Sequence, residues 1–232
     1  MLDILYDEGP CLVANKPAGL LTQAPRGIDS LEIWVKNFYR EREGKHPEDN
    51  IYLGLAHRID RPVTGAIVFA RHVRAARKLC MQFADRTVSK VYWAFAQGKV
   101  TPEEGTWRDY LHKRHGMAQA EVVDEHHPAG KRAVLHYRVL AHTDRGSWLE
   151  IELETGRTHQ IRIQAASRGH ALLGDSQYGS ETPFGEQHDD IRDRGIALHA
   201  RHLGFAHPMS GVAVHVEAPL PTSWGELKLP TL

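Results

Sequence analysis

The sequence is poor in cysteine and has no long apolar run. Its two cysteines, Cys11 and Cys80, lie far apart and form no CxxC pair, which argues against a disulfide framework or a thiolate zinc site and predicts two buried thiols. No stretch approaches the roughly 20 apolar residues that a membrane helix requires, and no basic and apolar leader opens the chain. We therefore expect a cytoplasmic protein without a membrane partner.

The sequence also lacks an excess of charge of either sign. Lys plus Arg and Asp plus Glu number 29 each, so the formal net charge is zero. Without an overall positive field, any site for nucleic acid must be a local basic patch, to which the 16 histidines could add charge below neutral pH. Candidate phosphate contacts, each of which could equally be a solvated surface charge, are Arg71, Arg74, Arg77, Lys78, Lys113, Arg114, Lys131, Arg132, Arg192, Arg194 and Arg201.

The pattern of apolar residues predicts one α+β domain. At 232 residues the chain is long enough for a single large core, and we expect one domain over 1–232 because no linker interrupts it. Strands outnumber helices and are not regularly interleaved with them, which favours a mainly antiparallel sheet. Strands are predicted over 4–6, 11–15, 66–70, 89–97, 134–141, 148–154, 197–205 and 212–217. Helices are predicted after a cap at Asp29 or Ser30, over 72–83 and from Thr158 to about Ser167. The weakly patterned stretch 101–131 is predicted to be a loop with a short hairpin.

Segment 57–71, HRIDRPVTGAIVFAR, is a polar loop followed by a short apolar run typical of a core strand. Asp60 stands between Arg58 and Arg61, whose positive charges favour an ionised carboxylate, as a nucleophile or general base requires. A structural ion pair or a turn contact is the alternative interpretation of the same residues.

A second polar cluster, Gly156 to Arg162, surrounds the predicted helix start. The helix would place Arg162 on the same face as Thr158 and His159, where it could pair with Asp60, meet a phosphate or be a solvated charge. Earlier, the strand 89–97 alternates, so that Lys90 and Tyr92 lie on the face opposite its apolar, core-facing side.

Histidine pairs suggest a metal site, for example His57 with Asp60 or His199 with His202. No HExxH pattern or other known ligand set occurs, so no metal is expected. The glycines match neither GxGxxG nor a P-loop, which leaves a nucleotide cofactor without support.

Five segments in order resemble the motifs of the RluA family of pseudouridine synthases. They are 15–21 (NKPAGLL), 57–65 (HRIDRPVTG), 90–92 (KVY), 156–162 (GRTHQIR) with 173–175 and 178–179 beyond it, and 198–208. The resemblance spans nearly the whole chain and implies a pseudouridine synthase fold, with a mixed, mainly antiparallel sheet, flanking helices and a central active-site cleft. Arg61-Pro62 is also similar to the tRNA-modifying TruC branch of the family.

The resemblance implies a role for individual residues. Asp60 becomes the catalytic aspartate, Tyr92 the active-site tyrosine and Arg162 the arginine that pairs with the aspartate. Arg58 would occupy the space that the target uridine leaves in its stack. The further residues that we predict to bind substrate are His57, Arg61, Thr64, Lys90, Arg157, His159 and Gln160.

The implied reaction isomerises a specific uridine in structured RNA, either tRNA or rRNA, to pseudouridine. The glycosidic C–N bond breaks, the uracil rotates, and ribose C1′ joins uracil C5; no cofactor is expected because no redox change or group donor is involved. The target base must be flipped out of its stack to reach Asp60. Attack of Asp60 on the sugar and removal of a ribose proton are both open.

We expect a monomer that needs no protein partner, binds an RNA stem-loop and lacks an S4-type RNA-binding domain. One alternative is a catalytically silent RNA-binding or RNA-folding protein with the same fold. The other is a metal-dependent hydrolase that uses Asp60 and histidines.

Overall fold

The computed structural model describes residues 2–113, 116 and 119–231, so the predicted phosphate contact of Arg114 lies outside the described residues. The chain falls into two compact units. The first unit comprises Met1–Lys90 and Ala200–Pro219, and the second comprises Val91–His199 and Leu220–Leu232. The strands are mostly antiparallel and accompanied by few helices, which confirms the α+β prediction. The expectation of one domain stays a prediction.

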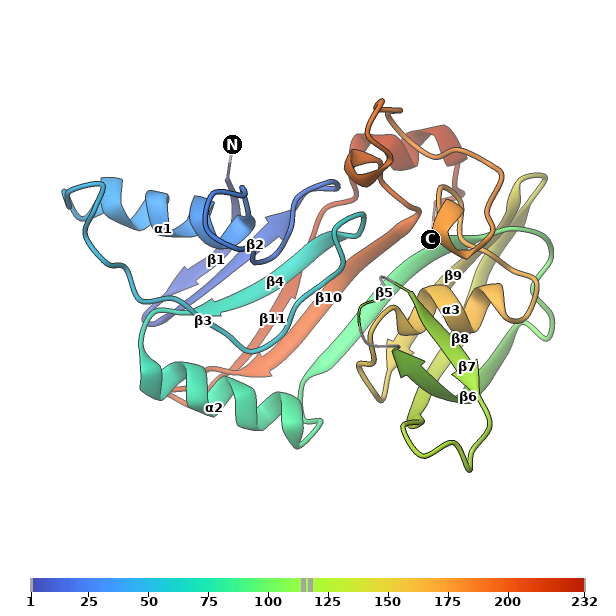
Figure 1. Ribbon diagram of the computed structural model, residues 1–232, viewed down its shortest axis with the longest axis horizontal. Helices are drawn as coiled ribbons and strands as arrows, with labels where there is room; N and C mark the ends of the chain where they lie inside the picture. Colours follow the sequence, from blue (N-terminus) through green and yellow to red (C-terminus); the bar gives the residue numbers. More distant parts are fainter. Residues whose placement is uncertain (1, 114–115, 117–118, 232) are drawn as a thin grey trace. The chain divides into compact units, whose positions relative to one another are not determined.

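The first unit contains a sheet in the order β1-β2-β4-β10, with β11 beside β10 and β3 beside β4. Helices α1 and α2 lie on opposite faces of this sheet (Figure 1). The element bounds are β1 (Asp3–Glu8), β2 (Cys11–Lys16), α1 (Leu31–Arg42), β3 (Gly54–Leu55), β4 (Thr64–Ala70), α2 (Val73–Ala84), β10 (Leu198–Ala206) and β11 (Ala213–Glu217).

Strand β4 is buried on both faces, which explains its uninterrupted apolar sequence. Ile67 and Phe69 pack into the cluster of α1, whereas Ala66, Val68 and Ala70 pack into the cluster of α2. All seven residues of the strand are buried. The prediction of a core strand after the charged loop is therefore confirmed.

Helix α1 begins after Ser30, one of the two predicted caps, and α2 begins one residue after the predicted start at His72. Ser30 caps α1 by accepting a hydrogen bond from the backbone N–H of Ile33, and His72 caps α2 by accepting one from Ala75. Helix α2 buries a face that includes Leu79 and turns Cys80 toward solvent. The prediction of two buried thiols is thus right for Cys11 and wrong for Cys80.

The second unit contains an antiparallel sheet in the order β5-β9-β8-β6-β7, and α3 packs over one of its faces. A cluster that includes Trp93, Trp148 and Trp224 covers β5 and β9 on the other face. The bounds are β5 (Ser89–Ala96), β6 (Glu104–Lys113), β7 (Ala120–Val123), β8 (Lys131–Thr143), β9 (Gly146–Leu153), α3 (Gln160–Ala166), and the 3-10 helices η1 (Ser176–Tyr178), η2 (Ile191–Asp193) and η3 (Thr222–Leu227).

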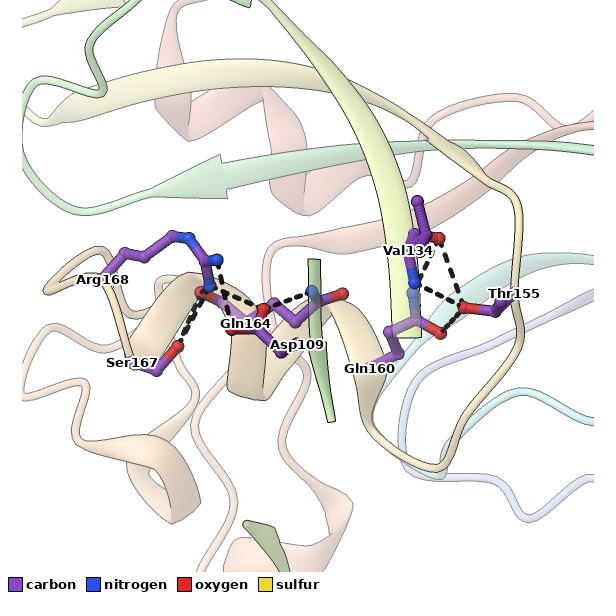
Figure 2. A network of polar contacts seen from close by, with 7 residues as sticks. All are labelled: Asp109, Val134, Thr155, Gln160, Gln164, Ser167 and Arg168. Carbon is purple, nitrogen blue, oxygen red and sulfur yellow. Dashed lines mark hydrogen bonds and ion pairs between the residues drawn. The ribbon is translucent and has the colours of Figure 1, made fainter. Parts of the chain in front are cut away.

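The sequence predicts a loop with a short hairpin over 101–131. The hairpin is present as the antiparallel pair of β6 and β7, but β6 is a ten-residue strand that also pairs with β8, so the stretch is not mainly loop. Trp107 and Leu111 point inward, and Asp109 lies between them on the same face. The carboxylate of Asp109 accepts hydrogen bonds from Gln164 and Arg168 near the end of α3 (Figure 2). A polar residue on the buried face hides the alternation that would have identified the strand.

Helix α3 begins later than the sequence predicted. Gln160 is its first residue, and His159 stands before it in the left-handed region, with φ 54° and ψ 24° and no side-chain cap. Thr158 and His159 therefore do not share a helix face with Arg162, because a left-handed residue separates them from the helix. The predicted end is correct, since Gly169 follows the helix with φ 80°.

Gly65 provides a test of packing in the first unit. A Cβ atom at Gly65 would lie 2.4 Å from the carbonyl oxygen of Ala200, and its φ is +114°. We expect Gly65→Ala to lower the free energy of unfolding by about 3 kcal/mol through strain and steric overlap together. Denaturant unfolding would measure the change.

Gly27 is the matched control, because its φ of +89° is also positive but no atom lies within 4 Å of an added Cβ. Gly27→Ala should cost about 1 kcal/mol, the strain alone. Equal losses in the two variants would show that the close approach to Ala200 contributes nothing.

Candidate active site

The backbone of the loop that carries Asp60 is held in place by hydrogen bonds. The hydroxyl of the buried Thr22 donates to the carbonyl of Ile59 (2.9 Å) and accepts from its N–H (3.3 Å). On the other side, the N–H of Val63 donates to the carbonyl of Asp60 at 3.1 Å. Asp60 is therefore fixed between two anchored residues directly before β4, as a reacting group on a loop requires.

Lys16, at the end of β2, lies beneath this loop and is fully buried. Its ammonium group donates to the carbonyls of Pro17 (2.8 Å), Leu20 (2.7 Å) and Arg61 (3.0 Å). Burial lowers the pKa of Lys16 to about 7, and the negative charge of Asp60 opposes that shift. A buried cation thus lies within electrostatic reach of the candidate catalytic carboxylate.

Lys16 is a residue to which the sequence analysis gave no role. It falls in the first RluA-like motif and ends the apolar strand CLVANK. A lysine in line with a buried strand is unusual, because lysine is almost never fully buried unless paired. A lysine at the end of an apolar strand is therefore the sequence signal that could have identified Lys16.

The predicted substrate-binding residues around Asp60 differ in their surroundings. Arg61 donates through Nε to the carbonyl of Gly19 at 2.7 Å, so its side chain joins the two loops. Thr64 is buried at the start of β4, whereas Arg58 is exposed to solvent. Of these three, Arg58 is the most accessible to a ligand.

His57 is held as a neutral imidazole. Its Nε2 accepts a hydrogen bond from the backbone N–H of Val68 at 3.0 Å, and its ring stacks on Phe83 of α2 with centroids 4.5 Å apart. Burial, together with the positive charge of Lys90, lowers the pKa of His57 to about 3. Burial and the charge of Arg86 in turn lower the pKa of Lys90. His57 therefore supplies no positive charge to a phosphate near neutral pH.

Tyr92 belongs to the second unit, and the strand register shows which face of the sheet carries it. It pairs with Ile151 on β9, which pairs with Tyr137 on β8, and directly opposite residues share a face. Alternation along β8 places Ala133 on this face as well, where it packs with Ile163 of α3. Tyr92 therefore lies on the face that α3 covers.

This position corrects the expectation for β5. The alternation of the sequence predicts that one face of the strand packs against the core and that Lys90 and Tyr92 lie on the other. Both faces are covered, because Ala94, on the side of Tyr92, is as fully buried as Phe95 on the other side. Tyr92 itself is half-buried.

Arg162, on α3, is held in place by the buried carboxylate of Asp175. Its Nε and Nη2 atoms donate to the two carboxylate oxygens of Asp175 at 2.7 and 2.8 Å, and Nη2 also donates to Gln177 at 2.7 Å. Arg162 and Asp175 are only 3% and 1% exposed. A bidentate pair of this kind orients the guanidinium plane firmly.

Tyr178 adds an aromatic contact to Arg162, whose guanidinium carbon lies 5.0 Å from the centre of the ring. The Tyr178 hydroxyl accepts from the backbone N–H of Ala120 (2.9 Å) and shares a hydrogen bond with Nδ1 of His159 (2.8 Å). Asp175, Gln177 and Tyr178 received no role from the sequence, although two of them fall in RluA-like segments.

Gln160 and Arg157 have contacts that stabilise the fold. The buried Gln160 donates to the carbonyl of Val134 and accepts from the Thr155 hydroxyl and from the N–H of Arg157 (Figure 2 shows the first two). Arg157 donates through Nε to the carbonyl of Arg132 at 3.0 Å. Their binding of substrate stays a prediction, as it does for His159.

Asp60 is in the first unit, and Tyr92 and Arg162 are in the second. Their joint action on one substrate stays a prediction. Across residues 2–113, 116 and 119–231, no group of three or more His, Cys, Asp or Glu side chains is arranged to hold a metal ion. In the same part of the chain, no helix is long and apolar enough to span a membrane.

Comparison with known proteins identifies the family. Residues 10–167 match the family model described as RNA pseudouridylate synthase. An uncharacterised RNA pseudouridine synthase of Synechocystis sp. is 32% identical over 97% of this chain and 68% of its own length. The ribosomal large subunit pseudouridine synthase D of Pseudomonas aeruginosa is 36% identical over 95% of this chain and 68% of its own length.

The chain belongs to the RNA pseudouridylate synthase family, in the RluA group that its motifs indicated, and it is an RNA pseudouridine synthase. Human RNA pseudouridylate synthase domain containing 4 has the same fold, with a TM-score of 0.78 and 23% identity over 99% of this chain and 94% of the human one. The predicted fold class and enzyme class are confirmed. The TruC branch is not addressed by these relatives and stays a prediction.

The neutral His57 predicts how stability depends on pH. Its pKa is about 3 in the folded protein and 6.5 ordinarily, so below about pH 6.5 the unfolded chain binds a proton that the folded chain does not. The free energy of unfolding should therefore fall by about 2 kcal/mol from this group between about pH 7 and pH 5.

A His57→Gln variant isolates this contribution, because glutamine can accept the Val68 hydrogen bond but does not titrate. Wild type should lose stability relative to the variant as the pH falls, measured by denaturant unfolding at each pH. Parallel curves for the two proteins would contradict the assignment of a neutral, half-buried His57.

Proposed function

We propose that this enzyme isomerises a uridine in large-subunit ribosomal RNA, with Asp60 as its catalytic carboxylate. The observation that carries the assignment is the immobilised loop, in which Thr22 and Lys16 fix the residues on either side of Asp60. The RNA class is taken from relatives such as the Pseudomonas aeruginosa enzyme, named for the large ribosomal subunit. We also propose that the enzyme acts in the cytoplasm as a monomer.

The reaction is an isomerisation, so it consumes no electrons and no group donor. The bond between ribose C1′ and uracil N1 breaks, a bond between C1′ and C5 forms, the C5 proton leaves, and N1 gains a proton. An ionised Asp60 serves this chemistry either by attacking the sugar or by removing a ribose proton.

Tyr92 and Arg162 complete the proposal. A phenol on a half-buried strand can stack against a flipped uracil and exchange a proton with it. Arg162 is the partner of the Asp60 carboxylate that the family resemblance implies. Its bidentate pair with Asp175 fixes the orientation of the guanidinium plane.

For Asp60→Asn we expect at least about a thousandfold loss of pseudouridine formation, because the amide can neither attack the sugar nor remove a proton. Tritium release from C5-labelled uridine in RNA measures the rate. RNA affinity should not change. Asp144→Asn, at an exposed carboxylate between β8 and β9, is the control and should be fully active. Full activity of Asp60→Asn would refute the central assignment.

For Tyr92→Phe we expect kcat to fall by about a hundredfold or more while KM stays the same, because the ring remains but the phenolic proton is lost. Tyr52→Phe, which removes a phenol from an exposed ring, should leave both constants unchanged. An unchanged kcat in Tyr92→Phe would remove the hydroxyl from the mechanism.

The substrate is tested by mapping pseudouridines in ribosomal and transfer RNA from cells with and without the gene. We expect the loss of one or more sites in large-subunit RNA. Loss of sites in tRNA alone would show that the RNA class is wrong and would favour the TruC branch. No change in any RNA would contradict the proposed function.

A further inference from the structure

Four of the candidate basic residues of the sequence form ion pairs within the protein. Arg71 pairs with Glu43 and lies 3.8 Å from the ring centre of Tyr39. Arg132, Arg192 and Arg201 pair with Glu154, Asp190 and Glu217, respectively. The charges of these four arginines are therefore already balanced by carboxylates of the protein.

Helix α2 differs from these sites. Arg74, Arg77 and Lys78 are exposed, and among the described residues none of the three has an ion-pair or side-chain hydrogen-bond partner. Their spacing of three and four residues places them on one face of the helix. The helix contains no acidic residue, and the nearest one after it, Asp85, is its C-cap.

The positions of these three charges also lower the stability of the helix. Arg74 lies in the first turn, where the helix dipole favours negative charge, and no acidic residue offsets it there. Like charges three and four residues apart repel each other as well. A face that costs stability and has no partner among the residues that the structure describes is suited to binding an anion from solution.

Helix α2 contacts the loop that carries the candidate catalytic residue Asp60. The ring of Phe83 stacks on His57, three residues before Asp60. More positive charge follows the helix, since Arg86 is near enough to Lys90 to affect its titration. The other exposed candidates, Lys113 and Lys131, are single lysines on β6 and β8 of the second unit.

We propose that the solvent face of α2, formed by Arg74, Arg77 and Lys78, binds the phosphate backbone of the substrate RNA. The proposal rests on the proposed function, because it takes RNA as the partner. It concerns the affinity for RNA and not the isomerisation step. Three local phosphate contacts also explain how a chain of zero net charge binds a polyanion, because the contacts depend on nearby charge and not on the total.

The test compares two triple variants with the same change in net charge. The first carries Arg74→Gln, Arg77→Gln and Lys78→Gln. The control carries Lys45→Gln, Arg138→Gln and Arg145→Gln, which remove cations that are already ion-paired with Glu43, Glu150 and Glu226. Binding of a fluorescein-labelled RNA hairpin is measured by anisotropy over a range of salt concentrations.

We expect the α2 variant to bind the hairpin at least about tenfold more weakly than wild type and the slope of log K against log salt to become shallower by about 2 to 3. The control should bind like wild type. An unchanged affinity and slope in the α2 variant, or an equal loss in the control, would overturn the proposal. Tighter binding to vesicles of anionic phospholipid than to the hairpin would also overturn it.

A charge-preserving variant, Arg74→Lys with Arg77→Lys, should keep the hairpin affinity within about threefold, because backbone phosphates are attracted by charge. A loss as large as that of the glutamine variant would contradict the proposal. If the glutamine triple variant does not fold, as judged by circular dichroism, each single substitution should still reduce the salt slope by about one.

Activity separates this proposal from the proposed function. At saturating RNA the α2 variant should form pseudouridine at the wild-type rate, whereas kcat/KM falls with affinity. A wild-type protein that forms no pseudouridine would end the proposed function, and hairpin binding would still decide the role of α2.

Discussion

The candidate active-site loop depends on one buried cation. Removing an ammonium group from water is costly unless polar groups replace the water, and three carbonyl oxygens do so for Lys16. Two of these carbonyls follow β2 and the third lies beside Asp60, so a single side chain joins two segments that are distant in sequence. The favourable interaction of Lys16 with Asp60 offsets part of the remaining cost. Lys16 thus stabilises the loop and also lies close to the candidate catalytic carboxylate.

Periodicity predicted the elements whose environments are uniform. Strand β4, buried on both faces, and the helices α1 and α2, each with one apolar side, lie close to where their sequences placed them. Strand β6 was missed because Asp109 occupies a buried position and is compensated by α3, which no local pattern reveals. The start of α3 was misplaced because the side chain of Gln160 organises the turn before it, and the left-handed His159 cannot be recognised from residue types.

For the site, the motifs identified positions but not contacts. Asp60, Tyr92 and Arg162 could be named from the sequence, whereas the pair between Arg162 and Asp175 and the burial of Lys16 depend on tertiary structure. His57 shows the same limit, because burial and Lys90 keep neutral a residue that the sequence predicted to bind substrate. The sequence shows which residues can carry a charge, whereas the fold determines which of these charges remain accessible to a ligand.

The exposure of Cys80 has a practical consequence. Cys11 is buried in the sheet, so a thiol-reactive reagent should modify the folded protein at Cys80 alone. Because Cys80 projects from α2 shortly after Lys78, a spin label or photo-crosslinker attached there would report distances from this helix to a bound molecule without any engineered cysteine. The native sequence thus already contains a single attachment point for spectroscopic work.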